Sequence, residues 1–223
     1  MVRLLFVSAL ALACSPIMAQ KAERLKLGKE IQLFNGKDLR GWTPFLSDPN
    51  VPASDVWTVD TAEKILICRG NPAGYIKTDR EYSDFILRLE WRFNPITRQA
   101  GNSGVLLRMV GKDMIWPRSI EAQLQSEAAG DFWLIEGARL DTPPERVDQG
   151  TPRHRLRTRT NEKPIGEWNT YEILCHGDRV VLKVNGETVN EGTGADLLSG
   201  RIGLQSEGSE IHFRNIRLRP IRK

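Results

Sequence analysis

Residues 84–93 read Asp-Phe-Ile-Leu-Arg-Leu-Glu-Trp-Arg-Phe, and this stretch decides the fold class. Apolar side chains occupy every second position from Phe85 to Phe93, while Arg88, Glu90 and Arg92 lie among the positions between them. A period of two over ten residues predicts a β-strand with one buried face and one polar face, and it excludes a helix.

A hairpin is indicated further along the chain. Residues 179–185 alternate in the same way and end at Asn185-Gly186, after which residues 187–189 form a second extended run. Asn-Gly between two strands is typical of a type I′ turn, because both central residues of that turn need a positive φ.

The last strand, residues 210–219, changes phase. Its apolar side chains fall on odd positions up to Phe213 and on even positions from Ile216 onward. One extra residue would reconcile the two halves, so we predict a β-bulge near Asn215.

No segment after residue 30 has a sustained helical period, and Gly, Asn, Asp and Pro separate short extended runs. This pattern predicts an all-β protein, a two-sheet antiparallel sandwich or a barrel. Residues 141–166 are rich in Pro, Arg and Thr and lack a period, so we expect a functional or disordered loop there. Further strands are expected at residues 31–34, 56–59, 64–68, 75–78, 103–109, 119–125, 131–136, 168–176 and 200–206.

The first 19 residues resemble a secretory signal peptide, with Arg3, an apolar run from Leu4 to Ala13 and a cleavage site after Ala19. The run is shorter than the roughly 20 residues that cross a bilayer. An alternative is a lipobox that leaves a lipid anchor at Cys14. We therefore expect an exported protein, periplasmic or extracellular, with residues 20–30 as a loose arm or short helix and residues 31–220 as one domain.

The formal net charge is +4, from 32 basic and 28 acidic residues, which is weak evidence for a polyanionic partner. The basic run Arg153–Arg159 has no interleaved aromatic residues, so we expect a solvated loop and no nucleic-acid partner. No later segment could span a membrane. Cys68 and Cys175 lie in apolar runs and favour two buried thiols, with a single disulfide as the alternative.

No cofactor is expected. His154, His176 and His212 are dispersed without metal-ligand spacing, and the sequence contains no zinc motif, phosphate loop or Gly-x-Ser-x-Gly elbow. A divalent metal held by backbone carbonyls would leave no pattern in the sequence, so that possibility stays open.

The segment 119–125 carries the first candidate site. Glu121, Gln123 and Gln125 fall on one side of this predicted strand. A carboxylate beside two amides suits sugar hydroxyls, because amides both donate and accept hydrogen bonds. An ordinary solvated strand face is the alternative.

A retaining glycosidase also needs a second carboxyl about 5–5.5 Å from the first, and an amide cannot replace it. The ordinary two-carboxylate mechanism is therefore not supported on this strand. Glu127, Asp131 or Glu136 could contribute a carboxyl from elsewhere.

Residues 101–108 predict a tight turn that enters a strand. Asn102 and Ser103 offer hydrogen-bonding groups there and Arg108 a cation, although an Asx-type turn is the simpler role for Asn102. Among the six tryptophans, Trp116 and Trp133 lie nearest the Glu121 strand and are candidates for stacking on a sugar ring. The tryptophans expected in the core are Trp42, Trp57, Trp91 and Trp168.

Several stretches, in order from about residue 30 to 220, resemble the 3-keto-disaccharide hydrolase domain family. They are residues 33–42, 82–93, Asn102-Ser103-Gly104-Val105, Glu121-Ala122-Gln123, 166–169, Val184-Asn185-Gly186, Gly203-Leu204-Gln205 and 213–216. The resemblance implies a jelly-roll sandwich of the concanavalin A-like lectin/glucanase type, export, and a glycoside or oligosaccharide partner oxidised to a ketone at C3.

A C3 ketone acidifies the proton on C2, so one base can start an elimination that expels the C1 substituent, after which water adds. Glu121 matches the family's Glu-x-Gln motif and is the candidate base. Arg108, Asn102 and Gln123 are candidates for holding the keto and hydroxyl oxygens. Residues 130–137 depart from the glycine-rich, tyrosine-bearing stretch of the family. The alternatives to an enzyme are a non-catalytic carbohydrate-binding module and an adhesive domain.

Overall fold

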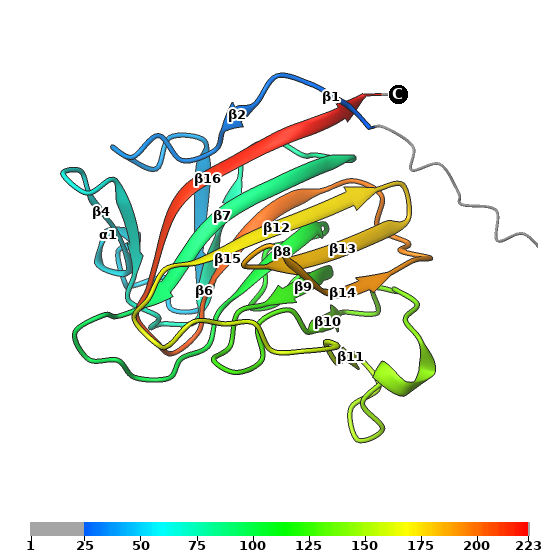
Figure 1. Ribbon diagram of the computed structural model, residues 1–223. Coiled ribbons are helices and arrows are strands. Elements are labelled where there is room, and N and C mark those ends of the chain that lie inside the picture. Colours follow the sequence, from blue (N-terminus) through cyan, green and yellow to red (C-terminus); the bar gives the residue numbers. More distant parts are fainter. Residues whose placement is uncertain (1–24, 223) are drawn as a thin grey trace, which may run out of the picture.

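The computed structural model describes residues 25–222, which form a sandwich of two antiparallel β-sheets (Figure 1). The expected signal peptide and Cys14 lie outside the described residues. Within residues 25–222, no helix has the length and apolar character needed to cross a bilayer.

One sheet has nine strands. Its spatial order is β14 (Glu187–Gly192), β13 (Arg179–Val184), β12 (Asn169–His176), β7 (Phe85–Phe93), β16 (Ile211–Arg222), β5 (Ile65–Cys68) and β4 (Trp57–Asp60). Two short strands, β1 (Lys26–Leu27) and β2 (Ile31–Gln32), also pair with β16.

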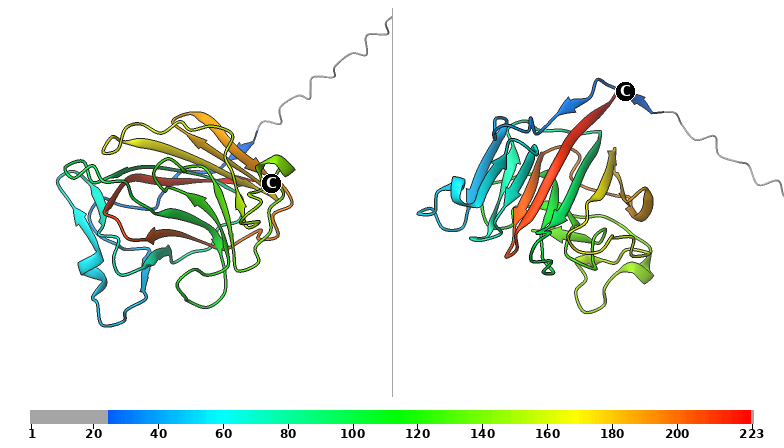
Figure 2. Two further views of the ribbon diagram at one scale, coloured as in Figure 1. Left: turned by 90° about the horizontal axis from the view of Figure 1, so that it is seen from below. Right: turned by 60° about the vertical axis from the view of Figure 1, so that its left-hand side comes forward.

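The other sheet has seven strands. Its order is β11 (His154–Arg155), β10 (Phe132–Ile135), β9 (Ser119–Gln123), β8 (Gly104–Met109), β15 (Arg201–Ser206), β6 (Gly74–Thr78) and β3 (Trp42–Leu46). The helices among the described residues are one short α-helix, α1 (Ala53–Val56), and one 3₁₀ turn, η1 (Pro144–Arg146). Figure 2 shows the two layers facing each other.

The hydrophobic core fills the space between the sheets. The five alternating apolar side chains of β7, from Phe85 to Phe93, are all buried, as their period predicts. They share one cluster with Val105, Ile120 and Ala122 of the seven-stranded sheet. Successive side chains of a strand point to opposite faces, so the neighbours of these residues along β8 and β9 point away from the core. This outer face carries the site described below.

Both local predictions of backbone geometry are confirmed. Asn185 and Gly186 have φ angles of 50° and 87°, as a type I′ hairpin turn requires. The register of β16 against β7 shifts between Arg214 and Arg217, with Asn215 at a φ of 54°. This shift is the predicted bulge.

Two expectations are wrong, and one strand was missed. In the expected arm, Lys26 and Leu27 pair with the end of β16 and form no helix. Strand β3 was not expected, because its sequence contains Pro44 and does not alternate; it lies at the edge of its sheet, where a proline is tolerated. Trp42, Trp57 and Trp91 are core residues as expected, but Trp168 is only half-buried.

Trp168 lies between two cations instead. The guanidinium carbons of Arg92 and Arg214 are 4.4 Å and 4.1 Å from its ring centroid. Cys68 and Cys175 are both free and buried, which confirms the two buried thiols.

Candidate active site

The site lies on the face of the seven-stranded sheet that points away from the core. In β9, Ile120 and Ala122 enter the core, so Glu121 and Gln123 face outward. Glu121 pairs with Trp133 of β10 and with Leu106 of β8. Directly opposed residues of antiparallel strands share a face, so these side chains are neighbours.

A cavity of about 250 Å³ opens on this face. It brings together six of the eight predicted site residues, Asn102, Trp116, Glu121, Gln123, Gln125 and Trp133. It also contains four residues that sequence reasoning did not assign to the site, Ile135, Arg153, Gln205 and Glu207. Thus side chains from three strands, β9, β10 and β15, and from the loops next to the strands of this sheet meet in one cavity.

Three acceptor oxygens in this cavity are buried without a hydrogen-bond donor among the described residues. They are Asn102 Oδ1, Glu121 Oε1 and Gln205 Oε1. Buried polar atoms in native proteins nearly always have a partner, so a cluster of unpartnered acceptors points to a ligand that brings donors. The Asx-type hydrogen bond considered for Asn102 is not made, because its Oδ1 is one of these unpartnered atoms.

Two of these oxygens lie over Gly104. A Cβ built at position 104 would come within 2.3 Å of Glu121 Oε1 and 2.4 Å of Gln205 Oε1. Glycine therefore leaves the space in which the carboxyl of β9 and the amide of β15 approach each other across β8.

The Glu121 residue is only 5% exposed, and its carboxyl has a strongly shifted pKa. Burial raises its pKa from an ordinary value of 4.5 to about 8, and the negative charge of Glu207 adds to the rise, while the Gln205 amide and the Arg153 cation oppose it. A carboxylate with a raised pKa is a stronger base than an ordinary one, and its protonated form persists near neutral pH.

Glu207 was missed because it follows the last residue of β15, where no alternation marks it. Burial raises the pKa of this half-buried carboxyl to about 7. Its neighbour Gln205 stands in the Gly203-Leu204-Gln205 stretch that carries part of the family resemblance, and this was the available signal. Glu127, Asp131 and Glu136, the alternatives for a second carboxyl, do not line the cavity.

Gln123 presents a hydrogen-bond donor to the cavity. Its Oε1 accepts hydrogen bonds from the backbone N–H groups of Leu124 and Gln125, at 2.8 Å and 2.9 Å. The oxygen is thereby occupied, and the Nε2 group is left to donate.

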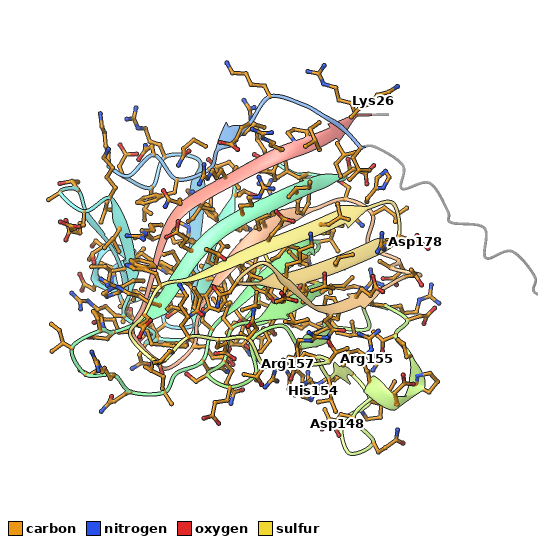
Figure 3. The ribbon with its side chains drawn as sticks, viewed as in Figure 1. Lys26, Asp148, His154, Arg155, Arg157 and Asp178 are labelled. Atoms are coloured by element: carbon orange, nitrogen blue, oxygen red, sulfur yellow. The ribbon has the colours of Figure 1, made fainter. Side chains whose placement is uncertain are left out.

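Trp133 is held as a flat wall of the cavity. Its ring stacks on His154 with centroids 4.3 Å apart and an interplanar angle of 10°. His154 lies between the carboxylates of Asp131 and Asp148, at 2.8 Å and 3.1 Å from its Nε2 and Nδ1. Figure 3 shows His154 and Asp148 together in the 141–166 loop.

That loop is therefore ordered against the site, and its basic run is not simply solvated. His154, Arg155 and Arg157 are half-buried, and Arg157 binds the buried Asp131 at 3.1 Å. The guanidinium of Arg153 lies 5.2 Å from the centroid of the Trp133 ring and reaches the cavity.

Trp116 comes from the segment between β8 and β9. It packs on a small apolar cluster on the outer face of the sheet, formed by Tyr75, Leu106, Met109 and Ile135. Asp113 of the same segment accepts a hydrogen bond of 2.7 Å from the Tyr75 hydroxyl. This contact fixes the segment over the sheet.

Two predicted site residues lie elsewhere. Arg108 is fully buried, and its φ of 49° interrupts the alternation of β8. Its guanidinium donates to the carbonyls of Ser83, Gly177 and Leu197 at 2.6–2.9 Å. The expectation that Arg108 holds substrate oxygens is therefore wrong.

Ser103 is also buried, and its hydroxyl donates to the carbonyl of Gln205 at 2.9 Å. It fastens β15 beside the site and does not line the cavity. Among residues 25–222, no group of three His, Cys, Asp or Glu side chains is placed to hold a metal ion.

Comparison with known proteins identifies the family. Residues 29–219 match the domain described as 3-keto-alpha-glucoside-1,2-lyase-like. The chain belongs to this family. A relative from Bacteroides thetaiotaomicron named 3-keto-disaccharide hydrolase is 26% identical over 85% of this chain and 77% of its own length.

Solved structures share the fold of this family member. A candidate glycosyl hydrolase from Parabacteroides distasonis is 22% identical, with a TM-score of 0.63 over 86% of this chain and 94% of its own. The carbohydrate-binding module CBM66 from Bacillus subtilis is 15% identical, with a TM-score of 0.53 over 79% of this chain and 94% of its own. The jelly-roll sandwich is confirmed, and family and fold together support a carbohydrate-active protein.

Proposed function

We propose that this protein is an exported enzyme that cleaves glycosides whose sugar carries a ketone at C3. The observation that carries the proposal is the group of three unpartnered acceptor oxygens, one of them on the buried Glu121 carboxyl, in a cavity walled by two tryptophans. Sugar hydroxyls supply donors for such acceptors, and a flat aromatic ring packs against the C–H face of a sugar.

Glu121 is the base in the proposed reaction. Its carboxylate takes the C2 proton, which the C3 ketone has acidified, and the resulting enolate expels the C1 oxygen with the second sugar. Water then adds to C1 of the enone, and C2 receives a proton again. Burial of Glu121 favours the first step, because it raises the pKa of the carboxyl and so reduces the difference from the pKa of the C2 proton.

The other cavity groups bind and orient. The Gln123 Nε2 group donates to the oxygen on which the enolate charge develops, and Asn102 and Gln205 accept from ring hydroxyls. Trp133 and Trp116 bind the faces of the sugar. The cavity of about 250 Å³ lies just below the range of roughly 300–1,000 Å³ for drug-sized ligands, which suits a single sugar ring.

The test is incubation with matched pairs of native and 3-oxidised disaccharides, followed by mass spectrometry of the products. We expect the oxidised members to be cleaved and the native members to remain intact. Cleavage of the native disaccharides alone would contradict the proposal.

A non-catalytic module is the second candidate, favoured by the fold shared with CBM66. Saturable binding of either sugar without any product would support it and exclude the enzyme.

A further inference from the structure

We propose that Glu207 is a second catalytic residue, which protonates the departing C1 oxygen and then takes a proton from the attacking water. This inference rests on the proposed function and assigns the leaving-group side of the reaction. Four observations support it.

The first observation is position. Glu207 follows β15 and lines the same cavity as Glu121, which comes from β9. The strand between them is β8, where Gly104 lets Glu121 and Gln205 approach. The two carboxyls thus reach one cavity from two strands, with the Gln205 amide close to Glu121.

The second observation is the lack of a counter-charge. Three other partly buried glutamates are paired with arginines: Glu90 with Arg214, Glu172 with Arg88, and Glu210 with Arg69. Glu162 accepts hydrogen bonds from backbone N–H groups instead. Within residues 25–222, Glu207 makes no ion pair and no side-chain hydrogen bond. Its carboxyl oxygens are not among the fully buried unpartnered atoms, so the carboxyl faces the open cavity, where it is free to meet a ligand.

The third observation is the coupling between the two carboxyls. The charge of Glu207 disfavours ionisation of Glu121, and burial disfavours ionisation of both. Such a pair holds a single proton over the interval between its two ionisations. The higher pKa of Glu121 places that proton mainly on Glu121, so the reactive form, with Glu121 ionised and the proton on Glu207, is a minority of the singly protonated pair.

The fourth observation is the chemical need that the cavity leaves. Its other groups are amides, tryptophans, Ile135 and Arg153. None of these protonates an alkoxide and recovers the proton near neutral pH. A sugar alkoxide is a poor leaving group, so a general acid accelerates its departure.

The proton balance closes with these two residues. Glu121 takes the C2 proton while Glu207 gives its proton to O1, and the C1–O1 bond breaks to release the second sugar. The Glu207 carboxylate then removes a proton from water as the hydroxyl adds to C1, and Glu121, whose proton has exchanged with the entering water, protonates C2. Both residues end in their starting state, and the net reaction is hydrolysis.

Leaving-group dependence tests the assignment. Glu207→Gln should lower the rate on a 3-keto-disaccharide by about a hundredfold or more, as loss of a general acid does. On 4-nitrophenyl 3-keto-glucoside the loss should be less than about tenfold, because nitrophenolate departs without a proton. Glu121→Gln should lower both rates, and Glu187→Gln, an exposed carboxyl on β14, should lower neither.

Equal losses of Glu207→Gln on the two substrates, or no loss on either, would overturn the role of Glu207. A parent protein inactive on both substrates would instead overturn the proposed function, so the two failures are distinguishable. Thermal melting of each variant checks that the fold is intact.

Discussion

Replacing Glu121 by glutamine is expected to lower kcat/KM for a 3-keto-disaccharide by about a hundredfold to ten-thousandfold. This is the usual range for loss of a general base, and glutamine keeps the size of the side chain but cannot take the C2 proton. Initial rates with parent and variant at pH 8 measure the effect. A variant as active as the parent would show that Glu121 is not the base.

The same substitution should stabilise the fold at alkaline pH. The folded-state pKa of Glu121 is about 8, against an ordinary 4.5. The protonated Glu121 side chain therefore makes its full contribution to the free energy of unfolding below about pH 4.5. This contribution is lost as the pH rises to 8. Above that pH the parent must bury a carboxylate whose Oε1 atom has no donor, whereas glutamine stays neutral.

We therefore expect Glu121→Gln to have the higher free energy of unfolding at pH 9, by on the order of 2 kcal/mol, and little difference at pH 4.5. Urea denaturation at the two pH values measures it. A variant with lower activity and higher stability at pH 9 would show that Glu121 is kept for function at a cost in stability. A variant with lower activity and lower stability would indicate a structural role for Glu121.

Replacing Arg108 by alanine is expected to lower the free energy of unfolding by about 3–5 kcal/mol. Arg108 is fully buried, and its guanidinium satisfies the carbonyls of Ser83, Gly177 and Leu197. Removing it leaves these carbonyls without a donor, opens a cavity and leaves Asp84 without its cation, which lies 3.3 Å away.

Urea denaturation at pH 7 measures this loss. The matched control is Arg88→Ala, which removes an arginine that is 47% exposed and paired with Glu172. We expect less than about 1 kcal/mol there, since exposed ion pairs contribute little. If Arg108→Ala unfolds at the same urea concentration as the parent, Arg108 does not hold the sandwich together.

Local patterns in the sequence were sufficient for much of the fold. The alternation of residues 84–93, the Asn185-Gly186 turn and the bulge at Asn215 each depend on neighbours in the chain, and each is confirmed. The row of Glu121 and Gln123 was found for the same reason. Short edge strands such as β3 and β11 were missed, because five or two residues carry too little period.

The rest of the site depends on contacts between distant segments. Arg108 was misplaced because its positive φ turns its side chain away from the face that alternation predicts. Glu207 was missed because it reaches the site only through the pairing of β15 with β8, and these two strands lie about a hundred residues apart in the sequence. The role of His154 behind Trp133 follows from the pairing of β10 with β11, which no local pattern indicates.

Cleavage of a 3-keto-disaccharide in D₂O tests the central claim most directly, with NMR and mass spectrometry of the released keto sugar. Abstraction of the C2 proton by Glu121 predicts deuterium at C2 of the product. A control with Glu121→Gln and isolated product corrects for exchange in solution. A substrate deuterated at C2 that reacts as fast as the unlabelled one, and whose product keeps the deuterium, would contradict proton abstraction and indicate direct displacement at C1.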